Sequence, residues 1–308
     1  MNKVSLGLGV VCLGLLSAKG FAQEAPFNNL LLLSPQIISP SQTYQVTKAG
    51  RFEGYLGLLN GKIKPKGTAN GGDTDVTGTD VGIDAYYAVN PMATVGVKLD
   101  YANGKASSLK NDSTEITPSV AVNLTEIFAL GVSAHLVSGS ADLPGGRNEN
   151  TSFNYYTLGA TMHQGLWEAT LAFSSKNKDD NKPQNSIAQS WGLHGRYKLM
   201  PNLALGLSLY QKDNSALSSG TAHAKDETGF GLHLESQFTD VFAGEFAFLS
   251  SADVDGASGD NGAEFLALGS WKVTPNMNLG ARLSYATTSS NIADTTALRA
   301  GVFVSTIF

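Results

Sequence analysis

The sequence predicts an all-β chain folded as an antiparallel up-and-down transmembrane β-barrel of about 14 strands. Apolar and polar residues alternate along many short segments, and short turns alternate with longer polar stretches along the chain. No segment reaches the roughly 20 apolar residues that a membrane-spanning helix needs. Because backbone groups in lipid must be paired within the protein, a form of this chain that spans a membrane has to close into a barrel.

Short turns recur along the chain. Three stretches share a proline turn followed by an alternating strand with a glycine five residues after the proline: Asn90–Tyr101, Met200–Tyr210 and Thr274–Tyr285. Proline supplies the fixed φ that a tight turn favours. Similar turns are predicted near residues 124–126, 164–165 and 239–240, so that six turns lie about 35 to 40 residues apart. This spacing predicts a hairpin repeat.

Seven longer polar stretches separate these turns: residues 61–75, 102–113, 138–151, 175–186, 211–227, 251–262 and 287–293. Six short and seven long connections make 14 strands, with both ends of the barrel on the short-turn side. Short periplasmic turns and longer extracellular loops are typical of bacterial transmembrane barrels. A periplasmic β-propeller, which also repeats at about 40 residues, is the alternative fold.

The two faces of the predicted strands differ in polarity. One parity is apolar, as in Val95, Val97 and Leu99, and we assign it to lipid. A soluble sandwich shows the same alternation, so alternation alone does not decide. The segment Glu264–Val273 departs from the pattern, because Leu266 and Leu268 take the polar parity, and its register is left open.

Aromatic residues favour the membrane interpretation. Six of them lie close to predicted short turns or to the chain end and are expected to form a periplasmic aromatic girdle: Trp167, Tyr197, Phe238, Phe242, Trp271 and Phe308. Aromatic side chains gather at membrane–water interfaces because one part of the ring prefers the apolar layer and another prefers water.

The N-terminal residues read as a secretory signal peptide. Lys3 precedes the apolar run 4–16, and small residues lead to a predicted cleavage after Ala22. The chain then divides into a signal peptide (1–22), an N-terminal periplasmic arm or possible plug (23–49) and the barrel (50–308). Cys12 is the one cysteine and lies in the signal, so the mature chain has no thiol for a disulfide, a metal site or catalysis.

Charge and motifs exclude several classes of function. Removing the signal leaves nineteen basic and 26 acidic residues, a formal charge of −7, which argues against a nucleic-acid partner. No phosphate-binding glycine loop or zinc motif is present, and no cofactor or metal is expected. His135, His163, His194 and His233 lack metal-ligand spacing and are expected to be wall residues, so the chain is not predicted to be an enzyme.

The polar parity supplies the predicted lumen lining, and a barrel of this size is wide enough for a lumen. The charged lining residues are Arg51, Glu53, Asp80, Asp84, Lys98, Asp100, Glu168, Arg196, Lys198, Glu235, Glu245, Arg282 and Arg299, and Lys272 shares their parity. Arg51, Arg282 and Arg299 are predicted to form a basic wall facing Asp80, Asp84 and Asp100. The alternative is that these charges pair across strands, as Glu168 and Arg196 could.

The C-terminal strand Leu298–Phe308 resembles the signal by which outer-membrane barrels are inserted, although Thr306 stands where a second large apolar residue is usual. This resemblance implies the cell outer membrane of a Gram-negative bacterium, recognition of the strand ending at Phe308 by the barrel-assembly machinery, and contact with outer-membrane lipid and lipopolysaccharide.

In strand count, hairpin spacing and mature length, residues 50–308 resemble the monomeric fourteen-stranded porin G type. The resemblance implies a passive diffusion channel for small hydrophilic solutes and ions, without specific binding residues. Two alternatives stay open: a substrate-specific uptake channel, for example for oligosaccharides or apolar solutes, and a plugged structural or adhesin barrel. For residues 23–49 an inert arm is favoured over a plug like the N-terminal hatch of fatty-acid transporters.

Overall fold

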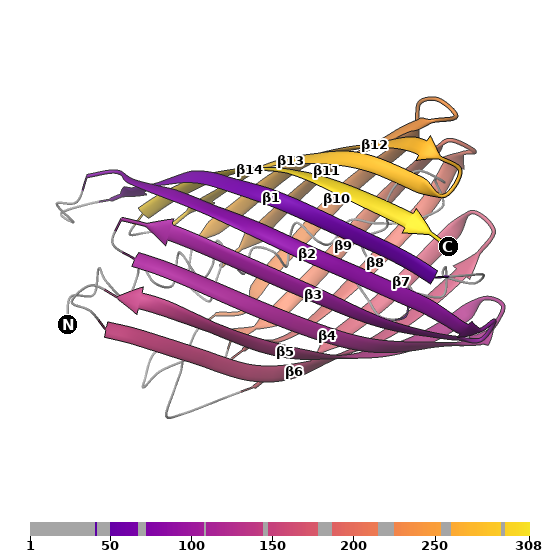
Figure 1. Cartoon of the computed structure of the whole chain (residues 1–308), viewed down its shortest axis with the longest axis horizontal. Coiled ribbons are helices and arrows are strands. Elements are labelled where there is room, and N and C mark those ends of the chain that lie inside the picture. The colour runs from indigo at the N-terminus through magenta and orange to yellow at the C-terminus, as the bar shows by residue number, and fades with distance from the viewer. Residues whose placement is uncertain are drawn as a thin grey trace.

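The protein folds as a closed antiparallel barrel of fourteen strands, as the computed structural model shows (Figure 1). The structure describes residue 41 and residues 50–66, 72–107, 109–143, 147–177, 187–214, 225–253, 260–290 and 293–308. Each strand pairs with its sequence neighbours, and β1 pairs with β14 to close the barrel. The predicted fold class is confirmed. The predicted signal peptide lies outside the described residues, as does the segment 23–49 except for Ser41.

The strands are β1 (Gly50–Pro65), β2 (Thr74–Asn90), β3 (Ala93–Ala106), β4 (Leu109–Thr125), β5 (Phe128–Leu143), β6 (Arg147–Gln164), β7 (Trp167–Ser174), β8 (Gln189–Met200), β9 (Leu203–Asp213), β10 (Glu227–Gln237), β11 (Phe242–Ala252), β12 (Asn261–Thr274), β13 (Met277–Ser289) and β14 (Ala293–Ile307). Across the described residues, no helix has the length and apolar character needed to cross a membrane.

All six short turns occur where the sequence predicts them, between β2 and β3 and at every second connection after that. The opposite end differs most from the prediction in two places, and shorter overlaps of strand with predicted loop occur elsewhere, as where β1 runs to Pro65. Residues 102–113 and 138–151 were expected to be loops, yet β3 runs to Ala106, β4 starts at Leu109, β5 runs to Leu143 and β6 starts at Arg147. These residues form strands because the hydrogen-bonded ladder continues beyond the apolar zone, where the outward side chains are polar and exposed.

The barrel closes at its short-turn end through the chain terminus. Gly50 N–H donates to the Phe308 carbonyl at 2.8 Å, and Phe308 N–H donates to the Gly50 carbonyl at 2.9 Å. Figure 1 shows the start of β1 beside the C-terminus. The Phe308 ring lies over the Gly50 Cα, in space that any Cβ at position 50 would occupy. Glycine is therefore required for this ring to cover the seam.

The outward face is apolar and exposed, whereas the inward face is mostly buried. Leu205, Leu207 and Leu209 on β9 are 45%, 47% and 41% exposed, whereas Ala204 and Ser208, on the alternate positions of the same strand, are about 1% exposed. The open register of β12 is resolved: Leu266 and Leu268 are buried at 3% and 8%, so both face inward. Their polar parity was read correctly, and the barrel interior contains leucines.

The six predicted girdle aromatics lie at the short-turn end. Trp167 is the cross-strand partner of Tyr197, and Phe242 is the partner of Trp271. The Phe238 and Phe242 rings stack with centroids 5.5 Å apart, and Phe308 closes the seam. These contacts place the aromatic side chains at a common depth, as an interface girdle requires.

A second ring of aromatics, which the sequence analysis missed, lies toward the loop end. Phe173 pairs with Trp191, and Phe265 pairs with Tyr285. Trp191 and Phe265 each lie six residues from a periplasmic aromatic on their own strand, Tyr197 and Trp271. Six residues of strand span roughly 20 Å. At the strand tilt of about 35–45° typical of transmembrane barrels, this length rises roughly 15 Å across the membrane, so the two rings mark the central part of an apolar belt that is about 25 Å tall in such barrels.

Placing a charge in the middle of this belt is expected to destabilise the barrel. We predict that Leu207→Lys lowers the free energy of unfolding by about 2–4 kcal/mol, because the ammonium would lie in hydrocarbon. Asn60→Lys, on the outward face toward the loop end, should cost only about 0–1 kcal/mol. Urea unfolding in lipid vesicles measures both, and equal costs would contradict the position of the belt.

Candidate functional site: the barrel interior

The structure places every predicted lining residue on the inward parity. Seven of them are buried: Arg51, Glu53, Asp100, Glu168, Arg196, Glu235 and Glu245. The other six, together with Lys272, are partly exposed: Asp80, Asp84, Lys98, Lys198, Arg282 and Arg299. The inner surface of the barrel therefore carries both signs of charge.

Neighbouring charges in the interior form ion pairs. Arg51 Nη2 lies 2.9 Å from Glu53 Oε2, and Lys98 Nζ lies 3.3 Å from Asp100 Oδ2. Glu168 and Arg196 are cross-strand partners, as the pairing alternative expects. The Arg196 guanidinium also reaches Glu235 on β10, with Nη2 at 3.0 Å from Oε2. Pairing of this kind compensates the desolvation of buried charges.

The predicted basic wall is not formed as expected. Arg282 and Arg299 are diagonal neighbours, because Arg282 is opposite Gly301 and Arg299 is opposite Ser284. Arg51 lies elsewhere: Arg299 pairs with Leu59, eight residues along β1 from Arg51, or roughly 26 Å at about 3.3 Å per residue. Adjacent strands bring two side chains together only when the side chains also lie at the same depth along the barrel, and Arg51 lies at a different depth from Arg282 and Arg299.

The acidic side of the proposed transverse field is not separated from the basic side. Arg282, Gly301, Gly57 and Asp80 lie in one row across four strands. The Asp80 carboxylate leans over Gly57, in space where a Cβ at position 57 would lie. Asp80 thus extends toward the strands that carry the arginines, and the charges intermix.

One polar network on β8 to β11 centres on two histidines. Ser208 Oγ lies 2.7 Å from His194 Nδ1 and 2.9 Å from His233 Nε2, and His233 Nδ1 lies 3.4 Å from Glu245 Oε1. All four side chains are about 1% exposed or less. A single directed chain can link them, with His194 donating to Ser208, Ser208 to His233, and His233 to Glu245.

A second polar network lies on β4 to β6. His135 Nδ1 is 2.7 Å from Glu115 Oε1, and the His135 ring stacks on Tyr155 with centroids 4.1 Å apart. Ser133 Oγ and Thr157 Oγ1 each lie 3.0 Å from His135 Nε2. The histidines therefore act as hydrogen-bonding wall residues, and His163 is partly exposed near the short-turn end. Within the described ranges no group of three or more His, Cys, Asp or Glu side chains could hold a metal ion.

Apolar side chains cover part of the inner wall at three depths. One cluster toward the loop end contains Leu59, Ile63, Val76, Ala106, Ala293 and Ala297. Ala247 and Leu266 form a second cluster at mid-depth. Ala243, Leu268 and Phe303 form the third, with Tyr55 packed against it. Sequence reasoning gave no function to these residues, although the inward leucines of β12 were the signal that could have revealed them.

Ser41 also lies in the interior, and it is the one described residue between 23 and 49. It is fully buried, and its Oγ lies 2.8 Å from Thr161 Oγ1 on the inward face of β6. Thr161 in turn bonds Thr170 at 2.9 Å, and Thr170 is the cross-strand partner of His194. This contact joins the segment before β1 to the polar wall.

Comparison with solved structures finds the same architecture in several outer-membrane proteins. A FadL homologue from Pseudomonas aeruginosa matches with a TM-score of 0.72 at 10% identity, over 93% of this chain and 96% of that one. The toluene transporter TbuX from Ralstonia pickettii matches with a TM-score of 0.72 at 10% identity, over 88% and 92%. The toluene transporter TodX from P. putida matches with a TM-score of 0.67 at 9% identity, over 88% of this chain and 92% of that one.

No protein-family model matches this sequence, and no curated protein matches it. At such low identity the structural matches establish the fold alone. They support the fourteen-stranded barrel and, at the level of fold, the expected outer-membrane location. They do not single out the porin G type.

The ion pair between Arg196 and Glu235 provides a test of interior packing. We predict that Arg196→Ala lowers the free energy of unfolding by about 3–5 kcal/mol, because it leaves a buried carboxylate without its cation. The double variant Arg196→Met/Glu235→Leu should restore part of this loss, since Glu235 is no longer stranded, although the buried Glu168 still loses its cross-strand partner. If the double variant is as unstable as the sum of both single variants, as thermal unfolding in detergent would show, the two groups are not coupled.

Proposed function

We propose that the protein is an outer-membrane uptake channel for small, largely apolar solutes. The observation that carries this proposal is the set of inward-facing apolar clusters, with Leu266 and Leu268 at their centre. A lumen that passes only hydrophilic solutes gains nothing from leucine and phenylalanine on its wall. A solute with apolar surface gains roughly 25 cal/mol for each Å² that it removes from water there.

The order of the clusters along the barrel supports a path. The first cluster lies at the loop end, where Ile63 on β1 pairs with Thr295 near the start of β14. Leu266 follows at mid-depth, and Leu268 with Phe303 lies closer to the short turns. A solute moving inward would pass from one apolar contact to the next. Several modest contacts favour release as well as entry.

The apolar clusters and the imidazole-centred networks lie mostly on different strands of the interior, and charged side chains lie among both. The apolar clusters belong to β11, β12, β14 and the first three strands, whereas the hydroxyl and imidazole networks belong to β4 to β11. A solute with an apolar body and one polar group fits such a cross-section, with the polar group toward the hydrogen-bonding wall. Similar folds described as toluene transporters and monoaromatic hydrocarbon channels are consistent with this solute class.

The passive hydrophilic channel predicted from the sequence is the competing function. It accounts for the inward charges, but the structure pairs several of these charges with one another, as in Arg51–Glu53 and Arg196–Glu235. It gives no role to the buried leucines of β12. The apolar solute channel accounts for both, since paired charges stabilise the wall and leave the apolar clusters to select the solute.

Polar substitution on the apolar path tests the proposal. We expect Leu266→Gln/Leu268→Gln to reduce uptake of toluene into vesicles carrying the barrel by about tenfold, because two amides would replace apolar side chains on the proposed path and a polar group without hydrogen-bond partners costs about 1–3 kcal/mol there. Leu209→Gln is the matched control and should leave uptake unchanged. Leu209 lies on the lipid face, near the second ring of aromatics toward the loop end. Swelling of the vesicles in arabinose reports hydrophilic diffusion in parallel, and rapid swelling with no measurable toluene uptake would contradict the proposal.

We also propose that the segment before β1 enters the lumen and restricts passage. The Ser41–Thr161 hydrogen bond supports a plug rather than the inert periplasmic arm. The proposal predicts that Ser41→Cys/Thr161→Cys forms a disulfide, since the mature chain is expected to have no other thiol. Oxidation should then lower single-channel conductance, and reduction should restore it. Unchanged conductance in fully oxidised protein would favour the arm.

A further inference from the structure

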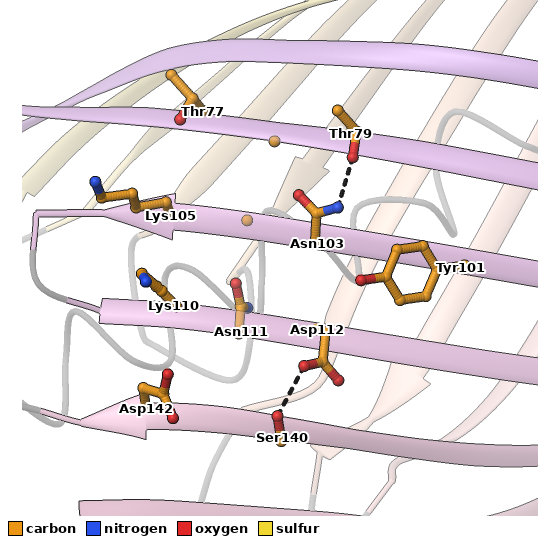
Figure 2. Close-up of a pocket in the computed structure, with 12 residues that line it drawn as sticks. Thr77, Thr79, Tyr101, Asn103, Lys105, Lys110, Asn111, Asp112, Ser140 and Asp142 are labelled. Carbon is orange, nitrogen blue, oxygen red and sulfur yellow. Dashed lines mark hydrogen bonds between the residues drawn. The ribbon is translucent and has the colours of Figure 1, made fainter. Parts of the chain in front are cut away.

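We propose that the outer surface of β2 to β5, above the outer aromatic ring, is a binding site for the phosphorylated sugar headgroup of lipopolysaccharide. A hollow of about 430 Å³ lies on this surface, and its lining includes Thr79, Asn103, Lys105, Lys110 and Asp112 (Figure 2). The site is on the outside of the barrel, so the inference does not depend on which solute crosses the lumen.

The cross-strand registers place the hollow just above the apolar belt. Successive outward rows across β2 to β5 change from apolar to polar toward the loop end. Ile83, Leu99, Ile116 and Leu136 form one row, and Val81, Tyr101, Thr114 and Ser138 form the next. Above them lie the row Thr79, Asn103, Asp112 and Ser140 and the row Thr77, Lys105, Lys110 and Asp142. Tyr101 thus marks the boundary, and headgroups of the outer leaflet would meet the two upper rows.

Two lysines in the top row oppose each other. Lys105 on β3 and Lys110 on β4 are direct cross-strand partners, and both are exposed. Like charges in this position destabilise a sheet. Neither lysine is within ion-pair distance of an acidic group in the described part of the chain. An anion held between the two ammonium groups would remove the repulsion, and a phosphate monoester suits paired lysines.

The remaining lining suits a sugar and its bridging cations. Asn103 Nδ2 donates to Thr79 Oγ1 at 2.6 Å, and Ser140 Oγ donates to Asp112 Oδ2 at 2.8 Å. Figure 2 shows these two pairs on neighbouring strands, with the Tyr101 hydroxyl between them and the apolar belt. Amides and hydroxyls in this arrangement can bond saccharide hydroxyls. Asp112 and Asp142 supply oxygen ligands of the kind that a divalent cation takes when it bridges to a phosphate.

The strands that carry this surface are longer than the hydrocarbon layer requires, so the surface lies beyond that layer. β2 and β4 each have 17 residues, and β5 has 16, whereas a tilted strand crosses the hydrocarbon layer in roughly 9–11. The extra residues carry the sheet beyond the acyl chains into the layer where lipid phosphates and sugars lie. A soluble anion could reach the same lysines, but the position directly above Tyr101 favours an anion attached to the outer leaflet.

The test is titration of the full-length mature barrel with purified rough-type lipopolysaccharide, followed by native mass spectrometry. Lys105→Gln/Lys110→Gln should weaken binding by about tenfold or more, since two charge-assisted contacts are lost. Lys105→Arg/Lys110→Arg should retain binding because both charges are kept. Lys64→Gln, which removes an exposed lysine at the loop end of β1, is the matched control and should not change it.

Dephosphorylated lipopolysaccharide identifies the group that is recognised. It should bind the wild-type barrel as weakly as intact lipopolysaccharide binds the Lys105→Gln/Lys110→Gln variant. The proposal would be overturned if the wild-type barrel and this variant bound intact lipopolysaccharide with equal affinity. Heat-modifiability on gels would confirm that both proteins are fully folded. Lysine-dependent dimerisation without lipopolysaccharide would overturn it as well, because the surface would then bind a second copy of the barrel.

Discussion

The structure depends on the closure of β1 against β14. Fifteen register pairs run from Arg51↔Ile307 to Pro65↔Ala293, and reciprocal hydrogen bonds between Gly50 and Phe308 complete the seam. A sheet with open edges would leave backbone N–H and C=O groups unpaired in lipid, which costs several kcal/mol for each group. Closure removes these edges and creates an inside and an outside. The alternating sequence can then place apolar side chains toward lipid while charged and hydrogen-bonding groups face inward.

Closure also forces the inward side chains of all strands to pack and bond within one enclosed space. Many charged, imidazole and hydroxyl groups of the interior are buried and bond to one another, as in the chain from His194 through Ser208 to His233. Such networks are stable only when most members are paired. The leucines and Phe303 form apolar clusters between these polar groups, and the proposed preference for apolar solutes rests on these clusters.

Strand number, turn positions and the inward parity of the charged residues could all be predicted from the sequence, because they follow from a period of two and from turn residues such as Pro91 and Pro201. Depth could not, since it depends on the stagger between strands, and this is why Arg51 was wrongly joined to Arg282 and Arg299. The outermost strand residues were predicted as loops because polarity marks the membrane boundary rather than the end of a strand. The inward leucines Leu266 and Leu268 left the register of β12 open in the sequence, and the structure shows that both face the interior.

Photoaffinity labelling is the first measurement to make, because it shows whether an apolar solute contacts the inner wall of the barrel. A small aromatic diazirine would be added to the barrel in vesicles, and the labelled residues would be mapped by mass spectrometry with and without excess toluene. The account predicts labelling at Leu266, Leu268 and Phe303 that toluene suppresses, in addition to lipid-face labelling that toluene leaves unchanged. Labelling confined to outward residues such as Leu205 and Leu207, with none on the inner wall, would contradict an apolar path through the barrel.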